Sequence, residues 1–167
     1  VREMYGIDNA SYMNSVCGDA SFIQFMANSR SGQFFFYSND GAYMIKTQTK
    51  QENKFLRRIL PHYYRHMTKY PDSMLCRFYG MHRVKMKHLR RRMHFVIMGS
   101  IFSTPLPIHI KYDLKGATYA GRSVSHEERL HRRCIGKSAP VLKDLNLTAN
   151  GQKFCMGTPE RRRVFLK

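Results

Sequence analysis

The chain has 167 residues, of which 43% are hydrophobic, so it is long enough for one domain with a sizeable core and too apolar for wholesale disorder. Its 29 lysines and arginines against 11 acidic residues give a net charge of +18, which favours an anionic partner: nucleic acid, phospholipid headgroups or phosphorylated metabolites. The sequence contains no run of 18 apolar residues, so a membrane-spanning helix is not expected. The four cysteines form no CxxC motif, so no metal or redox centre is expected.

The first 28 residues are expected to form two short helices, because apolar residues recur at helical spacing on either side of Gly18. Asp8 or Asn9 is a suitable N-cap for the first helix, since short polar side chains accept hydrogen bonds from the free N–H groups there. We interpret residues 1–30 as a helical flank. The chain opens with Val1 and not with an initiator methionine, its first residues carry no secretory signal, and we expect it to be part of a longer protein.

The segment 31–47 carries the strongest local signal. Its sequence, SGQFFFYSNDGAYMIKT, places an Asn-Asp-Gly turn between two runs of aromatic and apolar residues, which predicts a β-hairpin. Ser31 and Gly32 open the first strand, and a glycine there lets the backbone come close to a ligand. Alternation puts Lys46 on the same face as Met44, so this lysine either reaches solvent or meets an anion such as a nucleotide phosphate.

A long amphipathic helix is expected from about Gln51 to Tyr70, with its apolar residues in one stripe. Pro61 is expected to kink this helix or to end its first half. Glu52 lies at the start of the apolar stripe, and an acid that faces inward requires a cationic partner, for which Lys46 is the obvious candidate. The alternative is that Glu52 only complements the dipole at the helix N-terminus.

Three further strands are predicted within residues 74–86, 93–98 and 108–115, and the basic turn KMKHLRRR joins the first two. In the last strand, apolar residues alternate with a charged outer row that includes Asp113 and Lys115. Together with the hairpin, these strands predict an α+β fold: an antiparallel sheet of about five strands with helices packed on one side.

The remainder of the chain is less regular. Residues 116–140 are rich in Gly, Ser, Arg and His and predict a mobile basic loop with a helical turn near Glu127. Apolar residues return in the segment 141–167, where a short strand is expected at 151–156 and a helix begins at Thr158.

Several of these segments, in this order, resemble the phosphatidylinositol phosphate kinase family, in particular phosphatidylinositol 4-phosphate 5-kinases of plant or protist type. SGQFFFYSNDGAYMIKT resembles the family's glycine loop and strand lysine, HFVIMGSIF its strand and hinge, and IHIKYDLKGATYAGR its DLKGS-type motif. NKFLRRILPHYYRHM resembles the helix after the hairpin, and VLKDLNL, followed by NGQKF and RRRVFLK, resembles the segment that leads into a long helix. The DLKG segment is the most specific of these matches, and the resemblance spans nearly the whole chain.

The resemblance implies a lipid kinase with a protein-kinase-like amino lobe at residues 31–115, followed by the start of a second lobe at 141–167, truncated before the catalytic lobe is complete. Lys46 would hold the phosphates of ATP and pair with Glu52. The residues implied in nucleotide binding are Ser31, Gly32, Lys46, Glu52, Ser100 and Ile101, the last two through backbone groups at adenine. The residues implied in catalysis are Lys46, Asp113 and Lys115, although Lys115 also fits a rim lysine at the mouth of a loop.

The implied reaction transfers the γ-phosphoryl group of ATP, with Mg²⁺, to phosphatidylinositol 4-phosphate and gives phosphatidylinositol 4,5-bisphosphate. The resemblance also implies a cytoplasmic protein that attaches peripherally to the plasma membrane, where its basic turn attracts anionic lipid. A homodimer of the parent protein is an open alternative. The sequence departs from the family in its loop, SRSGQ, and at Ala117, where the family has serine. The family's catalytic and metal-binding aspartate motifs are not found in the 167 residues, so this fragment alone is expected to be inactive.

The rival interpretation is a non-catalytic basic module that binds phosphoinositides or nucleic acid. Aromatic residues beside basic ones, as at 34–37 and at Tyr63 and Tyr64, are able to stack on bases. Against nucleic acid, these aromatic residues fall on faces expected to be buried, and no established nucleic-acid-binding motif occurs.

Overall fold

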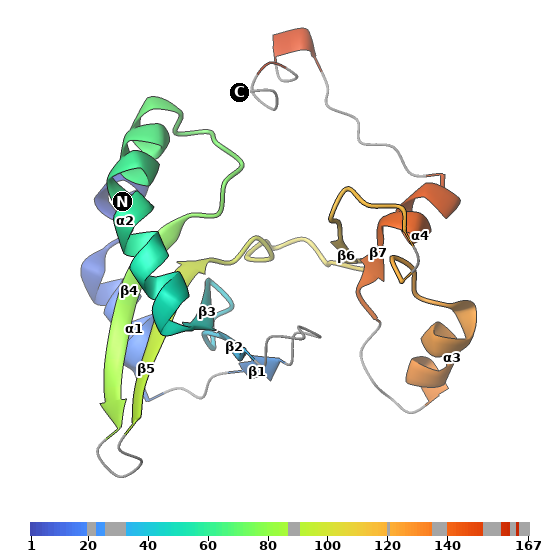
Figure 1. Cartoon of the computed structure of the whole chain (residues 1–167), viewed down its shortest axis with the longest axis horizontal. Helices are drawn as coiled ribbons and strands as arrows, with labels where there is room; N and C mark the ends of the chain where they lie inside the picture. The colour runs from blue at the N-terminus through green and yellow to red at the C-terminus, as the bar shows by residue number, and fades with distance from the viewer. Residues whose placement is uncertain are drawn as a thin grey trace. The chain divides into compact units, whose positions relative to one another are not determined.

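The computed structural model describes residues 1–19, 23–25, 33–86, 91–119, 121–134, 140–151, 158–160 and 163. The chain divides into two compact units, the first built mainly from Val1–Thr104 and the second from Pro105–Arg162. The first contains η1 (Glu3–Tyr5), α1 (Asn9–Cys17), β1 (Ile23–Phe25), β2 (Phe35–Tyr37), β3 (Tyr43–Gln48), α2 (Lys50–Lys69), β4 (Phe78–Met86) and β5 (Arg91–Gly99) (Figure 1). The second contains β6 (Tyr112–Asp113), α3 (His126–Cys134), β7 (Leu142–Lys143) and α4 (Asp144–Ala149).

An antiparallel sheet of five strands, in the order β1-β2-β3-β5-β4, forms the centre of the first unit. The predicted hairpin is confirmed as β2 and β3, with Phe36 opposite Ile45. Gly41 adopts the positive φ of 69° that its turn requires, and Asp40 accepts the N–H of Ala42 at 3.0 Å. Because β3 pairs with β2 on one side and with β5 on the other, it is the middle strand of the sheet.

Helices cover both faces of this sheet. On one face Tyr12 of α1 packs into a core cluster with Ile97 of β5. On the other face Leu56 of α2 packs with Val96, the neighbour of Ile97 along the same strand. Side chains of successive strand residues point to opposite faces, so α1 and α2 lie on opposite sides. The predicted α+β class and antiparallel sheet are confirmed, whereas the expected packing of helices on one side is corrected to packing on both.

Two helices of the first unit begin with a side-chain cap, of which the sequence predicted the first. Asp8 accepts the N–H of Ser11 at 2.8 Å and is the N-cap of α1. Thr49 and Glu52 form a capping box at the start of α2. Of the two alternatives predicted at Pro61, the end of a helix there is wrong, because α2 continues through it, and the kink stays a prediction. Proline removes one backbone hydrogen bond, but side chains on both sides of Pro61 pack the helix against the sheet: Leu56 packs with Val96 of β5, and the ring of Tyr63 lies against Phe78 of β4.

Two predicted elements differ in the structure. The second helix expected in residues 1–28 is replaced by strand β1, which pairs with β2 as the edge of the sheet. The strand expected at 108–115 is reduced to β6, which pairs in parallel with β7 in the second unit. Its alternating apolar residues remain partly exposed, at 43% for Ile108 and 51% for Ile110. Alternation alone does not make a strand, and the available partner, β7, is only two residues long.

The segment expected as a mobile basic loop, 116–140, contains helix α3 and a turn tied by hydrogen bonds to α4. Several expectations lie outside the described residues: those at Ser31 and Gly32, most of the strand at 151–156, and the middle of the basic turn. Within the described ranges, no helix is both long and apolar enough to cross a membrane.

Replacement of Ile97 by alanine tests this arrangement of the core. Ile97 is fully buried in the cluster that joins α1 to the sheet, so Ile97→Ala is expected to lower the free energy of unfolding by roughly 2–5 kcal/mol. Ile101→Ala is the matched control, because this isoleucine is 76% exposed and its loss is expected to change stability little. Equal effects of the two variants in denaturant-induced unfolding would contradict the placement of Ile97 in the core.

Candidate functional site

Lys46 lies on the middle strand of the sheet, on the face covered by α2. Its neighbours across the sheet are Phe35 of β2 and Val96 of β5. Its Nζ lies 3.9 Å from Oε1 of Glu52 and 5.7 Å from the centre of the Phe35 ring. The side chain is 30% exposed, so the ammonium group is partly desolvated and still accessible to an anion.

Glu52 is held by more than the lysine. The backbone N–H of Thr49 donates to its Oε2 at 2.7 Å, and Nε2 of Gln33 donates to Oε1 at 2.8 Å and to Oε2 at 2.6 Å. The pKa of Glu52 is lowered below its usual 4.5, mainly by the hydrogen bond from the Thr49 N–H and next by that from Gln33. The charge of Lys46 lowers it to a smaller extent. Both interpretations of Glu52 therefore apply, since it caps α2 and also pairs with Lys46.

Gln33 is a member of this site that sequence reasoning missed. It directly follows Ser31 and Gly32, which lie outside the described residues. A neutral amide carries no charge signal in a sequence, so only its two contacts with Glu52 reveal it. These contacts connect the start of the hairpin to the first turn of α2.

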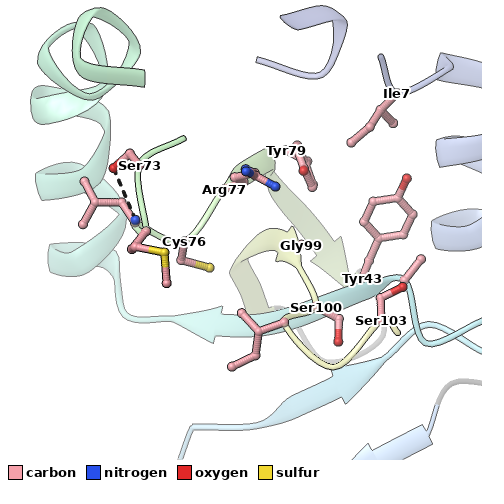
Figure 2. A pocket seen from close by; sticks show the side chains of 13 residues that line it. Ile7, Tyr43, Ser73, Cys76, Arg77, Tyr79, Gly99, Ser100 and Ser103 are labelled. Atoms are coloured by element: carbon pink, nitrogen blue, oxygen red, sulfur yellow. Dashed lines mark hydrogen bonds between the residues drawn. The ribbon is translucent and has the colours of Figure 1, made fainter. Parts of the chain in front are cut away.

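Ser100 and Ile101 follow β5 and border a pocket of about 400 Å³ (Figure 2). The N–H of Ser100 donates to the carbonyl of Ala42 at 2.9 Å, and the carbonyl of Ser100 accepts the N–H of Ser103 at 3.2 Å. Lys46 is not among the residues that line this pocket. Its lining residues are Ile7, Ala42, Tyr43, Ser73, Met74, Leu75, Cys76, Arg77, Tyr79, Gly99, Ser100, Ile101 and Ser103.

Asp113 and Lys115 belong to the second unit, whereas Lys46 and Glu52 belong to the first. Nζ of Lys115 lies 2.9 Å from Oδ1 of Asp113, and the two side chains are 61% and 49% exposed. The structure therefore brings this pair together at a solvent-accessible position at the end of β6. Within the described ranges, no three potential metal-ligating side chains lie together, so we assign no metal ligands.

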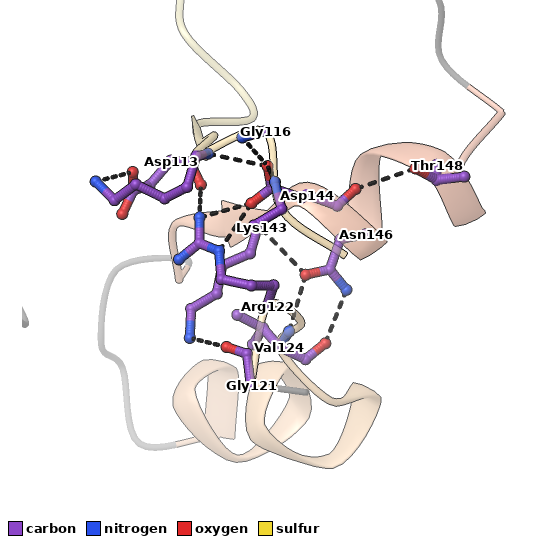
Figure 3. A network of polar contacts seen from close by, with 11 residues as sticks. Asp113, Gly116, Gly121, Arg122, Val124, Lys143, Asp144, Asn146 and Thr148 are labelled. Atoms are coloured by element: carbon purple, nitrogen blue, oxygen red, sulfur yellow. Dashed lines mark hydrogen bonds and ion pairs between the residues drawn. The ribbon is translucent and has the colours of Figure 1, made fainter. Parts of the chain in front are cut away.

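Arg122 and Asp144 form a buried ion pair beneath this position (Figure 3). Burial acts to raise the pKa of Asp144, but hydrogen bonds from Arg122 and from the backbone N–H groups of Lys115 and Ala117 outweigh it and hold that pKa well below its usual value. Sequence reasoning missed both residues. The signal was present: Asp144 stands among apolar residues in VLKDLNL, and a buried acid needs a cation.

Comparison with known proteins identifies the family. A family model described as "Phosphatidylinositol-4-phosphate 5-Kinase" matches residues 16–167. The chain belongs to the phosphatidylinositol-4-phosphate 5-kinase family. The resemblance seen in the sequence is thereby confirmed.

Relatives from this family come from plants and a slime mould. The chain is 40% identical over 147 residues to phosphatidylinositol 4-phosphate 5-kinase 8 of Arabidopsis thaliana, and this match covers 88% of this chain and 18% of the relative. It is 39% identical over 172 residues to a probable phosphatidylinositol phosphate kinase of Dictyostelium discoideum, covering 99% of this chain and 22% of that protein. The chain is 39% identical over 174 residues to phosphatidylinositol 4-phosphate 5-kinase 1 of Oryza sativa subsp. japonica, and the match covers 99% of this chain and 20% of that protein. The chain thus spans about a fifth of the length of these kinases.

The lowered pKa of Glu52 predicts a pH-dependent contribution to stability. Because the pKa of Glu52 is lower in the folded than in the unfolded chain, the ionised carboxylate stabilises the folded state. This stabilisation is fully present above the unfolded-state pKa and is lost as pH falls through the folded-state pKa. Glu52→Gln is therefore expected to lower the free energy of unfolding at pH 7, with a deficit that shrinks toward pH 3. Denaturant-induced unfolding at both pH values measures this, and Glu3→Gln, at an exposed acid of η1, is the control. A deficit independent of pH would contradict the charge-based account.

Proposed function

We propose that this chain supplies the nucleotide-binding part of a kinase that transfers the γ-phosphoryl group of ATP to phosphatidylinositol 4-phosphate, giving phosphatidylinositol 4,5-bisphosphate. The observation that carries the proposal is the position of Lys46: an ammonium group on the middle strand of the sheet, 3.9 Å from Glu52, in a chain of this family. Kinases of protein-kinase type use a strand lysine paired with a helix glutamate in this way. The 167 residues alone are proposed to be inactive.

ATP would be held by the first unit. Lys46 would contact the phosphates, because a partly desolvated cation attracts a triphosphate more strongly than one in bulk water. Ser31 and Gly32 would cover the phosphates. At the adenine, the N–H and carbonyl of Ser100 are already paired within the protein, so backbone groups of Ile101 and the second lone pair of the Ser100 carbonyl are the available contacts.

The inositol headgroup or the phosphates of ATP would meet Asp113 and Lys115. Lys115 is accessible and is now paired with Asp113, and an incoming phosphate would compete for the same ammonium group. Mg²⁺ would neutralise the nucleotide phosphates during transfer, as in other kinases. We assign none of its ligands to the described residues.

The protein would act in the cytoplasm, on the surface of the plasma membrane. Support comes from the net charge of +18 and from the β4–β5 hairpin, where the exposed Lys85 and Arg92 lie directly opposite each other. Like charges placed opposite each other repel, and an anionic lipid surface relieves that repulsion. The aromatic residues considered for base stacking divide: Tyr63 is only 8% exposed, whereas Phe34 and Tyr64, which were also expected on buried faces, are 48% and 52% exposed. A nucleic-acid-binding role has less support because the chain belongs to the phosphatidylinositol-4-phosphate 5-kinase family.

Replacement of Lys46 tests the proposed catalytic role. In the full-length protein, Lys46→Met is expected to reduce kcat/KM for phosphorylation of phosphatidylinositol 4-phosphate at least about 100-fold, because a preorganised positive charge at the phosphates is lost. Lys50→Met, at an exposed lysine on the first turn of α2, is the control. Full activity of Lys46→Met would refute the role of this lysine. Metal-dependent lipid phosphorylation by the isolated 167-residue chain would contradict its proposed inactivity.

Membrane attachment is tested at the β4–β5 hairpin. Neutralising both charges with Lys85→Gln and Arg92→Gln is expected to weaken binding to vesicles containing phosphatidylserine and phosphatidylinositol 4-phosphate by roughly 30-fold, at about 1 kcal/mol per charge. The control removes two exposed charges from α2, with Arg57→Gln and Arg65→Gln. Equal losses in the two double variants would show a general effect of net charge instead of a binding surface. Tighter binding to single-stranded DNA than to vesicles would favour the non-catalytic rival.

A further inference from the structure

The buried ion pair of the second unit, Arg122 and Asp144, is hydrogen-bonded to the backbone of Asp113 and Lys115 (Figure 3). Arg122 and Asp144 are each 8% exposed, and Oδ2 of Asp144 lies 2.8 Å from Nε and 2.6 Å from Nη2 of Arg122. A buried pair of this kind holds one geometry, because separating the two partners leaves an uncompensated charge in the interior.

Asp144 binds the backbone at one end of this turn. Its Oδ1 accepts hydrogen bonds from three successive N–H groups, those of Lys115 at 2.9 Å, Gly116 at 2.8 Å and Ala117 at 3.3 Å. Three consecutive donors reach one oxygen only in a tight turn, and Gly116 allows it with a φ of 68°. The backbone position of Lys115 is therefore set by the carboxylate of Asp144.

Arg122 binds the other end. Its Nη2 donates to the backbone carbonyl of Asp113, so the ion pair brackets the turn on both sides. The side chains of Asp113 and Lys115, by contrast, are about half exposed and contact each other. The buried pair thus acts on the backbone and leaves the two side chains available to a ligand.

We propose that Arg122 and Asp144 are positioning residues that hold Asp113 and Lys115 in place for phosphoryl transfer. This inference rests on the proposed kinase function and on the role given there to Asp113 and Lys115. Neither buried side chain needs to touch a substrate, since a displacement of a catalytic group by about 1 Å lowers a rate by up to roughly 100-fold.

The test is a double-mutant cycle in the full-length kinase, with kcat and KM measured for ATP and for phosphatidylinositol 4-phosphate in vesicles. Asp144→Asn keeps the side-chain shape and removes its charge, and is expected to lower kcat/KM roughly 10- to 100-fold, mainly in kcat. Lys115→Ala is then made in both backgrounds. Because the lysine is already misplaced in Asp144→Asn, its removal is expected to cost less there than in the wild type.

Asn146→Ala is the matched control. Asn146 is buried to the same extent as Asp144 and lies on the same helix, but its amide bonds Val124 and the N–H of Lys143 instead of the turn at 115–117. This variant is expected to lower the melting temperature, as Asp144→Asn does, while kcat/KM of the folded enzyme stays close to that of the wild type.

Three results would overturn the inference and leave the proposed function standing. They are unchanged kcat/KM in Asp144→Asn, a loss no greater than that in Asn146→Ala, and independent effects of Asp144→Asn and Lys115→Ala. No effect of Lys115→Ala in the wild type would remove the role of Lys115 and the inference together, and no lipid phosphorylation by the wild type would refute the function itself. If Asp144→Asn fails to fold, Arg122→Lys enters the same cycle, because it keeps the charge and loses the planar fork.

Discussion

The position of Lys46 depends on strand β3, which is hydrogen-bonded on both sides and cannot shift without breaking two strand pairings. Its ammonium group faces Glu52, whose own carboxylate is fixed by the Thr49 N–H and by Gln33. The lysine is therefore oriented by the protein itself, and the proposed contact with nucleotide phosphates would need little rearrangement. Preorganised charge of this kind is the main means by which kinases stabilise a transferring phosphoryl group.

The two units use the same physical device. In each, a carboxylate accepts backbone N–H groups at the start of a helix or in a turn, and a lysine of the proposed site lies next to it. Glu52 does this for Lys46 at the start of α2, where it remains partly exposed. Asp144 does it for the backbone of Lys115 from a buried position, with Arg122 as its counter-ion. Burial makes the second arrangement the more rigid of the two, because an unpaired charge there is far more costly.

Local patterns predicted much of the first unit. The turn sequence and flanking aromatic residues were enough to place β2 and β3, and strand alternation was enough to put Lys46 on the same face as Met44, because both depend only on neighbouring residues. The failures concern distant partners. Strand β1 forms because β2 offers it an edge, and the segment 108–115 is mostly irregular because its partner strand is short. Neither fact is encoded in the segment itself.

By itself, the sequence determined the family, the hairpin and α2, since motif order and residue spacing carry that information. It offered the pairing of a strand lysine with a helix glutamate as one of two interpretations, and the structure shows that pair. Only the tertiary structure decided that helices cover both faces of the sheet, that Gln33 joins Glu52, and that Arg122 reaches Asp144 across 22 positions of the chain. The physical reason is that a buried charge or a sheet face is satisfied by whichever group the fold brings to it. That group is fixed by the packing of the whole unit, and local sequence does not specify it.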